Sequence, residues 1–142
     1  MVKLLDSQAK KEIVTAIVEA EKQTSGEIRV HVKAHCRGQA LEEAKKIFSR
    51  LGMHRTRRRN GVLIFVAFQS KKFAILGDEG IHRHAGDSFW NQTRDAMASH
   101  FSKGRFREGV VAGVRSVGGK LARHFPADQR KIDELLDTVT ES

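Results

Sequence analysis

The chain alternates between stretches in which apolar residues recur every three or four positions and stretches in which they run together or alternate with polar residues. The first kind covers residues 7–24, 39–51, 88–100 and 106–123. In the first of these, Ile13, Ala16, Ile17 and Ala20 fall on one side of a helix and lysines and glutamates on the other. These four stretches are predicted to be amphipathic helices, and a weaker pattern at 128–138 predicts a short terminal helix.

The second kind predicts three strands. Residues 61–68 form an unbroken apolar run, typical of a strand buried on both faces. After a polar turn at 69–72 the chain returns as the apolar segment 73–76, so the two segments are predicted to form an antiparallel hairpin. Residues 27–32 alternate strictly, which predicts a strand with one well-buried face. The inward positions there are Ile28, Val30 and Val32, and the opposite positions are Glu27, Arg29 and His31.

The resulting element order is α-β-α-β-β-α-α, followed by the terminal helix. Helices before, between and after a few strands indicate an α/β fold: a three-layer α/β/α sandwich, with a small twisted mixed β-sheet flanked by helices on both faces. The 142 residues suit one domain spanning 1–142, with 1–5 and 127–142 as peripheral segments.

Composition narrows the class of protein. Hydrophobic residues make up 39% of the chain and charged residues 30%, as in folded water-soluble domains. No apolar stretch is long enough for a membrane span, and the first residues lack the apolar core of a signal peptide. The single cysteine, Cys36, excludes an internal disulfide. These features predict a cytoplasmic protein.

The formal net charge of +9 favours anionic partners, although a basic surface also simply keeps a protein in solution. The densest run of basic residues is the loop 55–59, of sequence RTRRR. No aromatic residue interrupts this run, and no helix-turn-helix or zinc-finger spacing accompanies it. These features argue against a nucleic-acid partner, and they leave a small phosphorylated molecule, a nucleotide or a membrane surface as candidate anionic partners.

Candidate chemistry lies at the rim of the hairpin. The return strand ends in two carboxylates, Asp78 and Glu79, enclosed by glycines, and Asp87 follows shortly after. Because the hairpin is antiparallel, Asn60 at the start of one strand is expected beside Asp78 at the end of the other. Carboxylate and amide oxygens are the ligands of hard cations. Purely structural roles remain open, since Asp78 and Glu79 suit a turn, Asp87 a helix cap, and Asn60 the position before a strand.

Several of these segments together resemble the TPM domain family. They are SGEIRV at 25–30, NGVLI at 60–64, ILGDEGI at 75–81, the following Asp87, and HFSKGRFREGVVAGV at 100–114. The resemblance is strongest to short, free-standing bacterial members. It implies an α/β/α sandwich, acid phosphatase or nucleotide phosphohydrolase activity, and binding of Ca²⁺ or Mg²⁺ near the carboxylate loops. Many members also carry an Asp-Tyr-Ala element before the first helix, where this chain has VKLL at 2–5 and no tyrosine anywhere.

The leading hypothesis is a TPM domain protein that binds a divalent cation and hydrolyses phosphate esters weakly. The ion would polarise a phosphoryl oxygen or orient water, and an arginine fork would bind the phosphate. The alternative is a non-catalytic interaction module whose basic face binds an acidic protein, a membrane surface or a nucleic acid. The candidate residues are Asn60, Asp78, Glu79 and Asp87 for the metal, Asp78 and Asp87 for catalysis as ligand or general base, and Arg57, Arg58 and Arg59 for the substrate.

Overall fold

The computed structural model describes residues 6–83, 87–127 and 139–142. Within these ranges the predicted helices and strands are present, with a short helix after the hairpin and a C-terminal strand in addition. The elements are α1 (Ser7–Glu21), β1 (Glu27–Lys33), α2 (Ala40–Arg50), η1 (Met53–Arg55), β2 (Gly61–Ala67), β3 (Lys72–Gly77), α3 (Glu79–His82), η2 (Asp87–Trp90), α4 (Asn91–Phe101), α5 (Phe106–His124) and β4 (Val139–Glu141).

The four strands form one mixed sheet in the order β3-β2-β1-β4. β1 pairs in parallel with both β2 and β4, and β2 pairs antiparallel with β3, so the predicted hairpin is confirmed. The parallel pairing of β1 with β2 requires a crossover, which α2 supplies. Residues 128–138, for which a terminal helix is predicted, lie outside the described residues.

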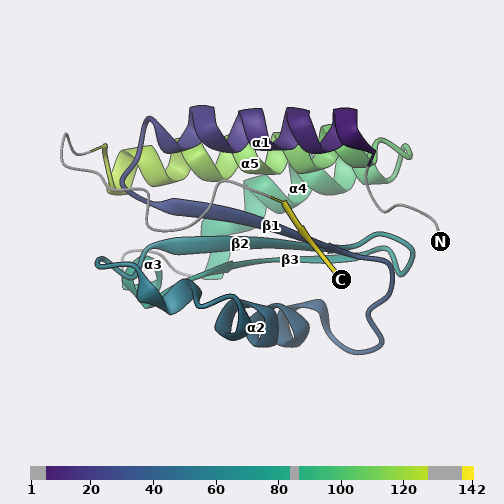
Figure 1. The fold of residues 1–142 in the computed structure, drawn as a ribbon, viewed down its shortest axis with the longest axis horizontal. Coiled ribbons are helices and arrows are strands. Elements are labelled where there is room, and N and C mark those ends of the chain that lie inside the picture. Colours follow the sequence, from purple (N-terminus) through teal and green to yellow (C-terminus); the bar gives the residue numbers. More distant parts are fainter. Residues whose placement is uncertain (1–5, 84–86, 128–138) are drawn as a thin grey trace.

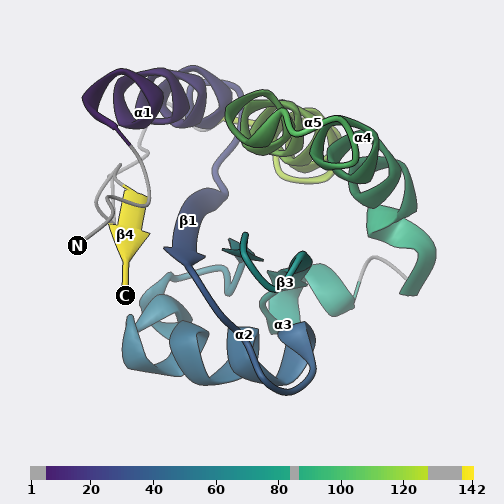
Figure 2. The same ribbon diagram turned by 90° about the vertical axis from the view of Figure 1, so that its right-hand side faces the viewer.

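Helices cover both faces of the sheet, which confirms the predicted three-layer sandwich. Figure 1 shows α1 and α5 side by side above the strands and α2 below them, and Figure 2 shows α4 beside α5 on the same side. Alternation along the strands separates two apolar cores. Val62, Ile64 and Ile75 pack against α1, α4 and α5, whereas Leu63 and Phe65 pack against α2.

The helix boundaries follow local side-chain chemistry only in part. Asp6 caps α1 by accepting a hydrogen bond from the Ala9 amide at 2.7 Å, as its short carboxylate predicts. The predicted helix 88–100 is divided into η2 and α4, and Trp90, rather than the predicted Asp87, occupies the N-cap position of α4.

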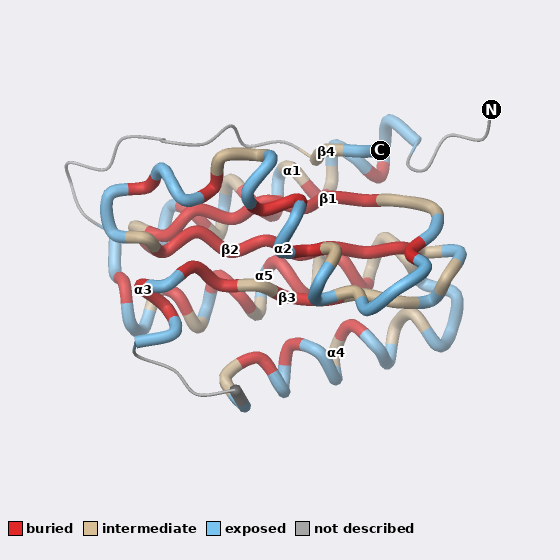
Figure 3. The backbone as a smooth tube through the Cα atoms, turned by 90° about the horizontal axis from the view of Figure 1, so that it is seen from below, coloured by how far each residue is buried: buried red, intermediate tan, exposed pale blue. Residues whose placement is uncertain are grey.

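The central strand β1 differs from its predicted environment. Its polar positions Glu27, Arg29 and His31 are as buried as its apolar ones, so the expectation of a single buried face is wrong (Figure 3). His31 is held by two hydroxyls from the C-terminal segment: its Nδ1 lies 2.6 Å from Thr140 Oγ1 and its Nε2 lies 2.8 Å from Ser142 Oγ. Burial, and then the positive charges of nearby basic residues, lower the pKa of His31 to about 4, so the ring is neutral.

Candidate functional site

The carboxyl end of β3 and the loop before β2 meet at one end of the sheet. The Asp78 amide donates to the Gly61 carbonyl at 2.9 Å, which continues the β2–β3 ladder by one step. The next residues form α3, whose N-cap is Asp78. We call the side chains of His54, Arg59, Asp78 and Glu79, which meet here, the Asp78 corner.

Asp78 is the centre of this corner. Its side chain is only 2% exposed, and three N–H donors and one histidine ring nitrogen surround its carboxylate. Arg59 Nε lies 2.9 Å from Oδ2, and Arg59 Nη2 lies 3.1 Å from Oδ1. The Glu79 amide and His54 Nδ1 approach Oδ1 at 2.7 and 3.2 Å. A fork of this kind is among the strong charge-assisted pairings in proteins.

These contacts keep Asp78 ionised. Burial by itself would raise the pKa of Asp78, but the hydrogen bonds from Arg59 and from the Glu79 amide, with the charge of Arg59, outweigh it. The net result is a pKa below the ordinary value of an aspartate. Asp78 is therefore a carboxylate throughout the neutral range, and a weak base.

Glu79 lies beside Asp78 but faces solvent, with a side chain 53% exposed. Its carboxylate pairs with Arg83 at 2.9 Å and approaches Arg59 Nη1 at 3.5 Å. The hydrogen bond from Arg83, and the charges of Arg83 and Arg59, lower the pKa of Glu79. One guanidinium, that of Arg59, thus lies against two ionised carboxylates.

Arg59 is held in this position by its backbone. It adopts a left-handed conformation, with φ of 51°, and its carbonyl accepts a hydrogen bond from the Gly80 amide at 2.8 Å. A Cβ atom at Gly80 would lie 2.2 Å from the Arg58 carbonyl oxygen and 2.6 Å from that of Arg59. Only glycine permits the loop and α3 to approach this closely, and this approach places Arg59 over Asp78.

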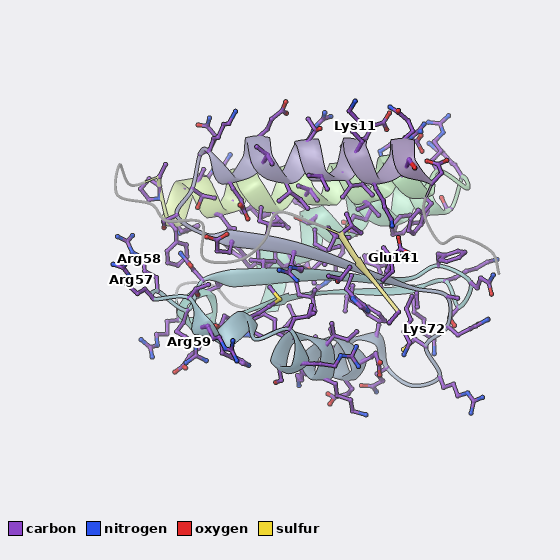
Figure 4. All side chains as sticks on the ribbon, viewed as in Figure 1. Lys11, Arg57, Arg58, Arg59, Lys72 and Glu141 are labelled. Atoms are coloured by element: carbon purple, nitrogen blue, oxygen red, sulfur yellow. The ribbon has the colours of Figure 1, made fainter. Side chains whose placement is uncertain are left out.

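The other two candidate arginines take different directions. Figure 4 shows Arg57 and Arg58 extending from the end of the molecule, whereas Arg59 lies close to α3. Arg57 and Arg58 are exposed. Of the three arginines predicted to bind a substrate, Arg59 is therefore the one that belongs to the Asp78 corner.

Asn60 does not join this corner in the described structure. Gly61 lies opposite Asp78, so the side chain of the preceding residue projects from the other face of the sheet. There Asn60 is 1% exposed, and its Nδ2 donates to Ser25 Oγ at 3.3 Å. Asp87 begins η2, but its side chain lies outside the described residues, so its distance from Asp78 stays a prediction.

A shallow hollow of about 320 Å³ adjoins the Asp78 corner. Its lining combines the two carboxylates with several nitrogen- or hydroxyl-bearing side chains. These are Lys45, Ser49, His54, Arg59 and His82. The corner therefore presents a buried anion, an exposed anion and a set of basic groups to one small volume.

Asp78 and Glu79 are two adjacent carboxylates. No third acidic, histidine or cysteine side chain in the described ranges completes a metal-binding group with them. His54 approaches Asp78 from α2's side of the sheet, and no sequence motif links the two residues. The sequence therefore gave no reason to expect His54 beside Asp78.

Comparison with protein families identifies the chain. Residues 1–120 match the model of the TPM domain. The chain belongs to the TPM domain family. No curated protein sequence matches this TPM domain. None of the helices within residues 6–83 and 87–127 is both long and apolar enough to cross a membrane.

The solved structures that resemble this TPM domain include the following two. The NMR structure of the BA42 protein from the psychrophilic bacterium Bizionia argentinensis is 41% identical, with a TM-score of 0.93, and the match covers 100% of this chain and 98% of that one. The N-terminal domain of the cg2496 protein from Corynebacterium glutamicum is 14% identical, with a TM-score of 0.65, over 97% and 81% of the two chains. The second match supports the fold alone.

Proposed function

We propose that this TPM domain binds a divalent cation, Mg²⁺ or Ca²⁺, at Asp78 and Glu79 in exchange for the Arg59 guanidinium. The observation that supports the proposal is the position of Arg59, which lies 2.9 Å from Asp78 and 3.5 Å from Glu79. One positive charge already occupies the space between two adjacent carboxylates. A hard cation prefers the same oxygen atoms.

The exchange is sterically reasonable because the groups that bury Asp78 are themselves half exposed. The side chains of Arg59 and His54 are 40% and 48% exposed, although the Asp78 side chain beneath them is 2% exposed. Displacing Arg59 alone would open Asp78 to the hollow. Two carboxylates with water and phosphate oxygens suit Mg²⁺ in particular, since Mg²⁺ is seldom held by protein ligands alone.

We further propose that the released guanidinium of Arg59 binds a phosphate group in the adjoining hollow, and that the domain is a weak phosphohydrolase. A planar guanidinium binds phosphate through two parallel hydrogen bonds. Lys45 lines the same hollow and adds positive charge. A bound cation would neutralise charge on the phosphoryl oxygens. Asp78 would act as a ligand, because its lowered pKa makes it a poor general base.

Cation titration of chelator-treated protein, followed by backbone amide NMR, tests the binding step. We expect Mg²⁺ and Ca²⁺ to shift the amides of residues 78–80, and Glu79→Gln to weaken the affinity. Asp78→Asn should abolish binding. Glu42→Gln on α2 removes a similarly exposed carboxylate, with a side chain 62% exposed, and should leave binding unchanged. Equal affinity in the wild type and Asp78→Asn would place any cation elsewhere.

Phosphate release from p-nitrophenyl phosphate, ATP and ADP, with Mg²⁺ or with chelator, tests the second step separately. We expect turnover that requires the cation and Asp78. Cation binding without turnover would remove the phosphohydrolase proposal and leave the binding proposal standing.

A further inference from the structure

A hollow of about 460 Å³ lies between the β2–β3 turn and the α4–α5 turn, which are at the same end of the molecule (Figure 1). The Asp78 corner lies at the opposite end of β3, and the hollow has none of its residues in the lining. A volume of this size is typical of pockets that hold small organic molecules. The lining includes four phenylalanines, which are Phe68, Phe73, Phe101 and Phe106.

The four rings form a continuous chain of contacts. Phe73 meets Phe101 edge-on, with ring centroids 5.3 Å apart, and Phe101 lies roughly parallel to Phe106 at 5.9 Å. Phe68 in turn meets Phe106 edge-on at 5.6 Å. All four rings are half-buried, so each retains accessible surface where it borders the hollow. The hairpin and the two helices thus contribute to one aromatic wall rather than to scattered apolar residues.

The polar group available at the rim of the hollow is the ammonium of Lys71. Lys72 also lines the hollow, but its Nζ donates to the backbone carbonyls of Cys36 and Gly38, at 3.1 and 2.9 Å. Lys71 is exposed, and its ammonium has no hydrogen-bond or ion-pair partner among the described residues. The described lining holds no carboxylate. The hollow therefore offers a ligand an apolar wall and one accessible positive charge.

Lys71 also has a backbone conformation that is unusual for lysine. Its φ is 57°, in the left-handed region, where a turn favours glycine or asparagine. Backbone outliers of this kind concentrate at functional sites and ligand clamps. The position of Lys71 is thus a second observation, independent of the hollow itself, that indicates a ligand at this end of the molecule.

We propose that the hollow binds a small aromatic carboxylate, with its ring against Phe73 and Phe101 and its carboxylate paired with Lys71. A flat ring extends the chain of aromatic contacts, which stabilises beyond the apolar area that it buries. The ammonium at the rim favours an anion over a neutral molecule of the same shape. An apolar pocket with one polar group that fixes the orientation is the usual form of a small-molecule site. Binding here is independent of cation binding at the Asp78 corner.

Naphthoate, titrated into the isotope-labelled full chain and followed by NMR, is the probe. We expect saturable shifts, and nuclear Overhauser contacts from the naphthoate protons to the rings of Phe73 and Phe101. Three analogues of the same size identify what is recognised. Neutral naphthamide and cationic naphthylmethylamine should bind more weakly because they lack the carboxylate. Saturated decahydronaphthoate, which has the charge but no aromatic ring, should bind about threefold to tenfold more weakly.

Matched variants separate the charge from the wall. Lys71→Gln should weaken naphthoate about threefold to fivefold and leave naphthamide unchanged. Lys46→Gln removes the same charge from an exposed position of α2 outside the hollow, and should change neither affinity. Phe73→Leu should weaken both ligands, since it removes a ring of the wall. Phe48→Leu alters the core on the other face of the sheet, so it controls for lost stability and should leave both affinities unchanged.

Four outcomes would overturn the proposal. The first is absence of binding up to the solubility limit of naphthoate. The second is equal affinity for naphthoate and naphthylmethylamine, or tighter binding of decahydronaphthoate. The third is a set of contacts that lies outside the hollow, or affinity that neither Lys71→Gln nor Phe73→Leu changes. The fourth is a stable dimer by analytical ultracentrifugation in which a second copy of the chain already contacts Phe73 and Phe101.

Discussion

Gly80→Ala tests whether close packing of α3 on the arginine loop holds the Asp78 corner together. The added Cβ would lie 2.2 Å from the Arg58 carbonyl oxygen and 2.6 Å from the Arg59 carbonyl oxygen. Both are backbone atoms, so no side-chain rotation can relieve the overlap. The loop must move away from α3, and the 2.8 Å hydrogen bond from the Gly80 amide to the Arg59 carbonyl lengthens or breaks.

The expected cost follows from these two effects. Overpacking a tight contact destabilises by about 1–3 kcal/mol, and losing a hydrogen bond costs roughly 0.5–1.5 kcal/mol. The gain from restricting the unfolded chain, about 0.4–1 kcal/mol, offsets part of this. We therefore expect Gly80→Ala to lower the free energy of unfolding by about 2–3 kcal/mol.

Urea unfolding at constant pH measures this change. Gly119→Ala is the control, because no atom lies within 4 Å of a Cβ at that exposed position of α5. The control should be stabilised by up to about 1 kcal/mol through helix propensity. A Gly80→Ala protein as stable as the wild type would refute the close contact between α3 and the arginine loop.

Three further changes test the packing and the buried histidine. Gly118→Ala should lower the free energy of unfolding in urea by about 1–3 kcal/mol, because its Cβ would lie 2.6 Å from Ala20 Cβ; no loss would contradict the α1–α5 contact. Met97→Ala should cost about 2–5 kcal/mol in the same assay, since Met97 is fully buried, and a smaller loss would mean that the site collapses. Folding lowers the pKa of His31 from 6.5 to about 4. The free energy of unfolding is therefore highest, as far as His31 decides it, above pH 6.5, and it decreases as the pH falls toward 4. That loss is at most roughly 3 kcal/mol, and a pH dependence that persists in His31→Gln would assign it to another group.

The spacing of apolar residues was sufficient to predict most of the fold. The run at 61–67 is buried at every position, as its unbroken hydrophobicity predicts. The helical spacing at 13–17 places Ile13, Ala16 and Ile17 in the core. Burial of apolar surface dominates folding energetics, and its period is visible in one dimension.

The polar positions of β1 were predicted wrongly for a specific reason. Alternation distinguishes the two faces of a strand but does not reveal what covers the second face. Here α2 and the C-terminal segment cover it, and hydroxyls of Thr140 and Ser142 satisfy His31 from more than a hundred residues away. β4, which carries Thr140, has only three residues and no pattern that could predict it.

The position of the two carboxylates at the end of the hairpin follows from the sequence, but their contacts do not. Asp78 and Glu79 lie together at the predicted end of the hairpin. Asn60 differs from the register partner of Asp78 by one residue, and one residue is enough to reverse the face of a strand. Which of three adjacent arginines meets Asp78 depends on the left-handed backbone of Arg59, which the sequence RRR does not disclose.

The exchange between Arg59 and a divalent cation is measured most directly by calorimetric titration of Mg²⁺ and Ca²⁺ into Arg59→Gln and wild-type protein. Glutamine removes the competing charge but retains a hydrogen-bond donor. We predict that Arg59→Gln binds the cation about fivefold to tenfold more tightly, as expected for removal of a partly exposed competing ion pair, while turnover of p-nitrophenyl phosphate falls. Unchanged or weaker cation affinity in Arg59→Gln would contradict the exchange.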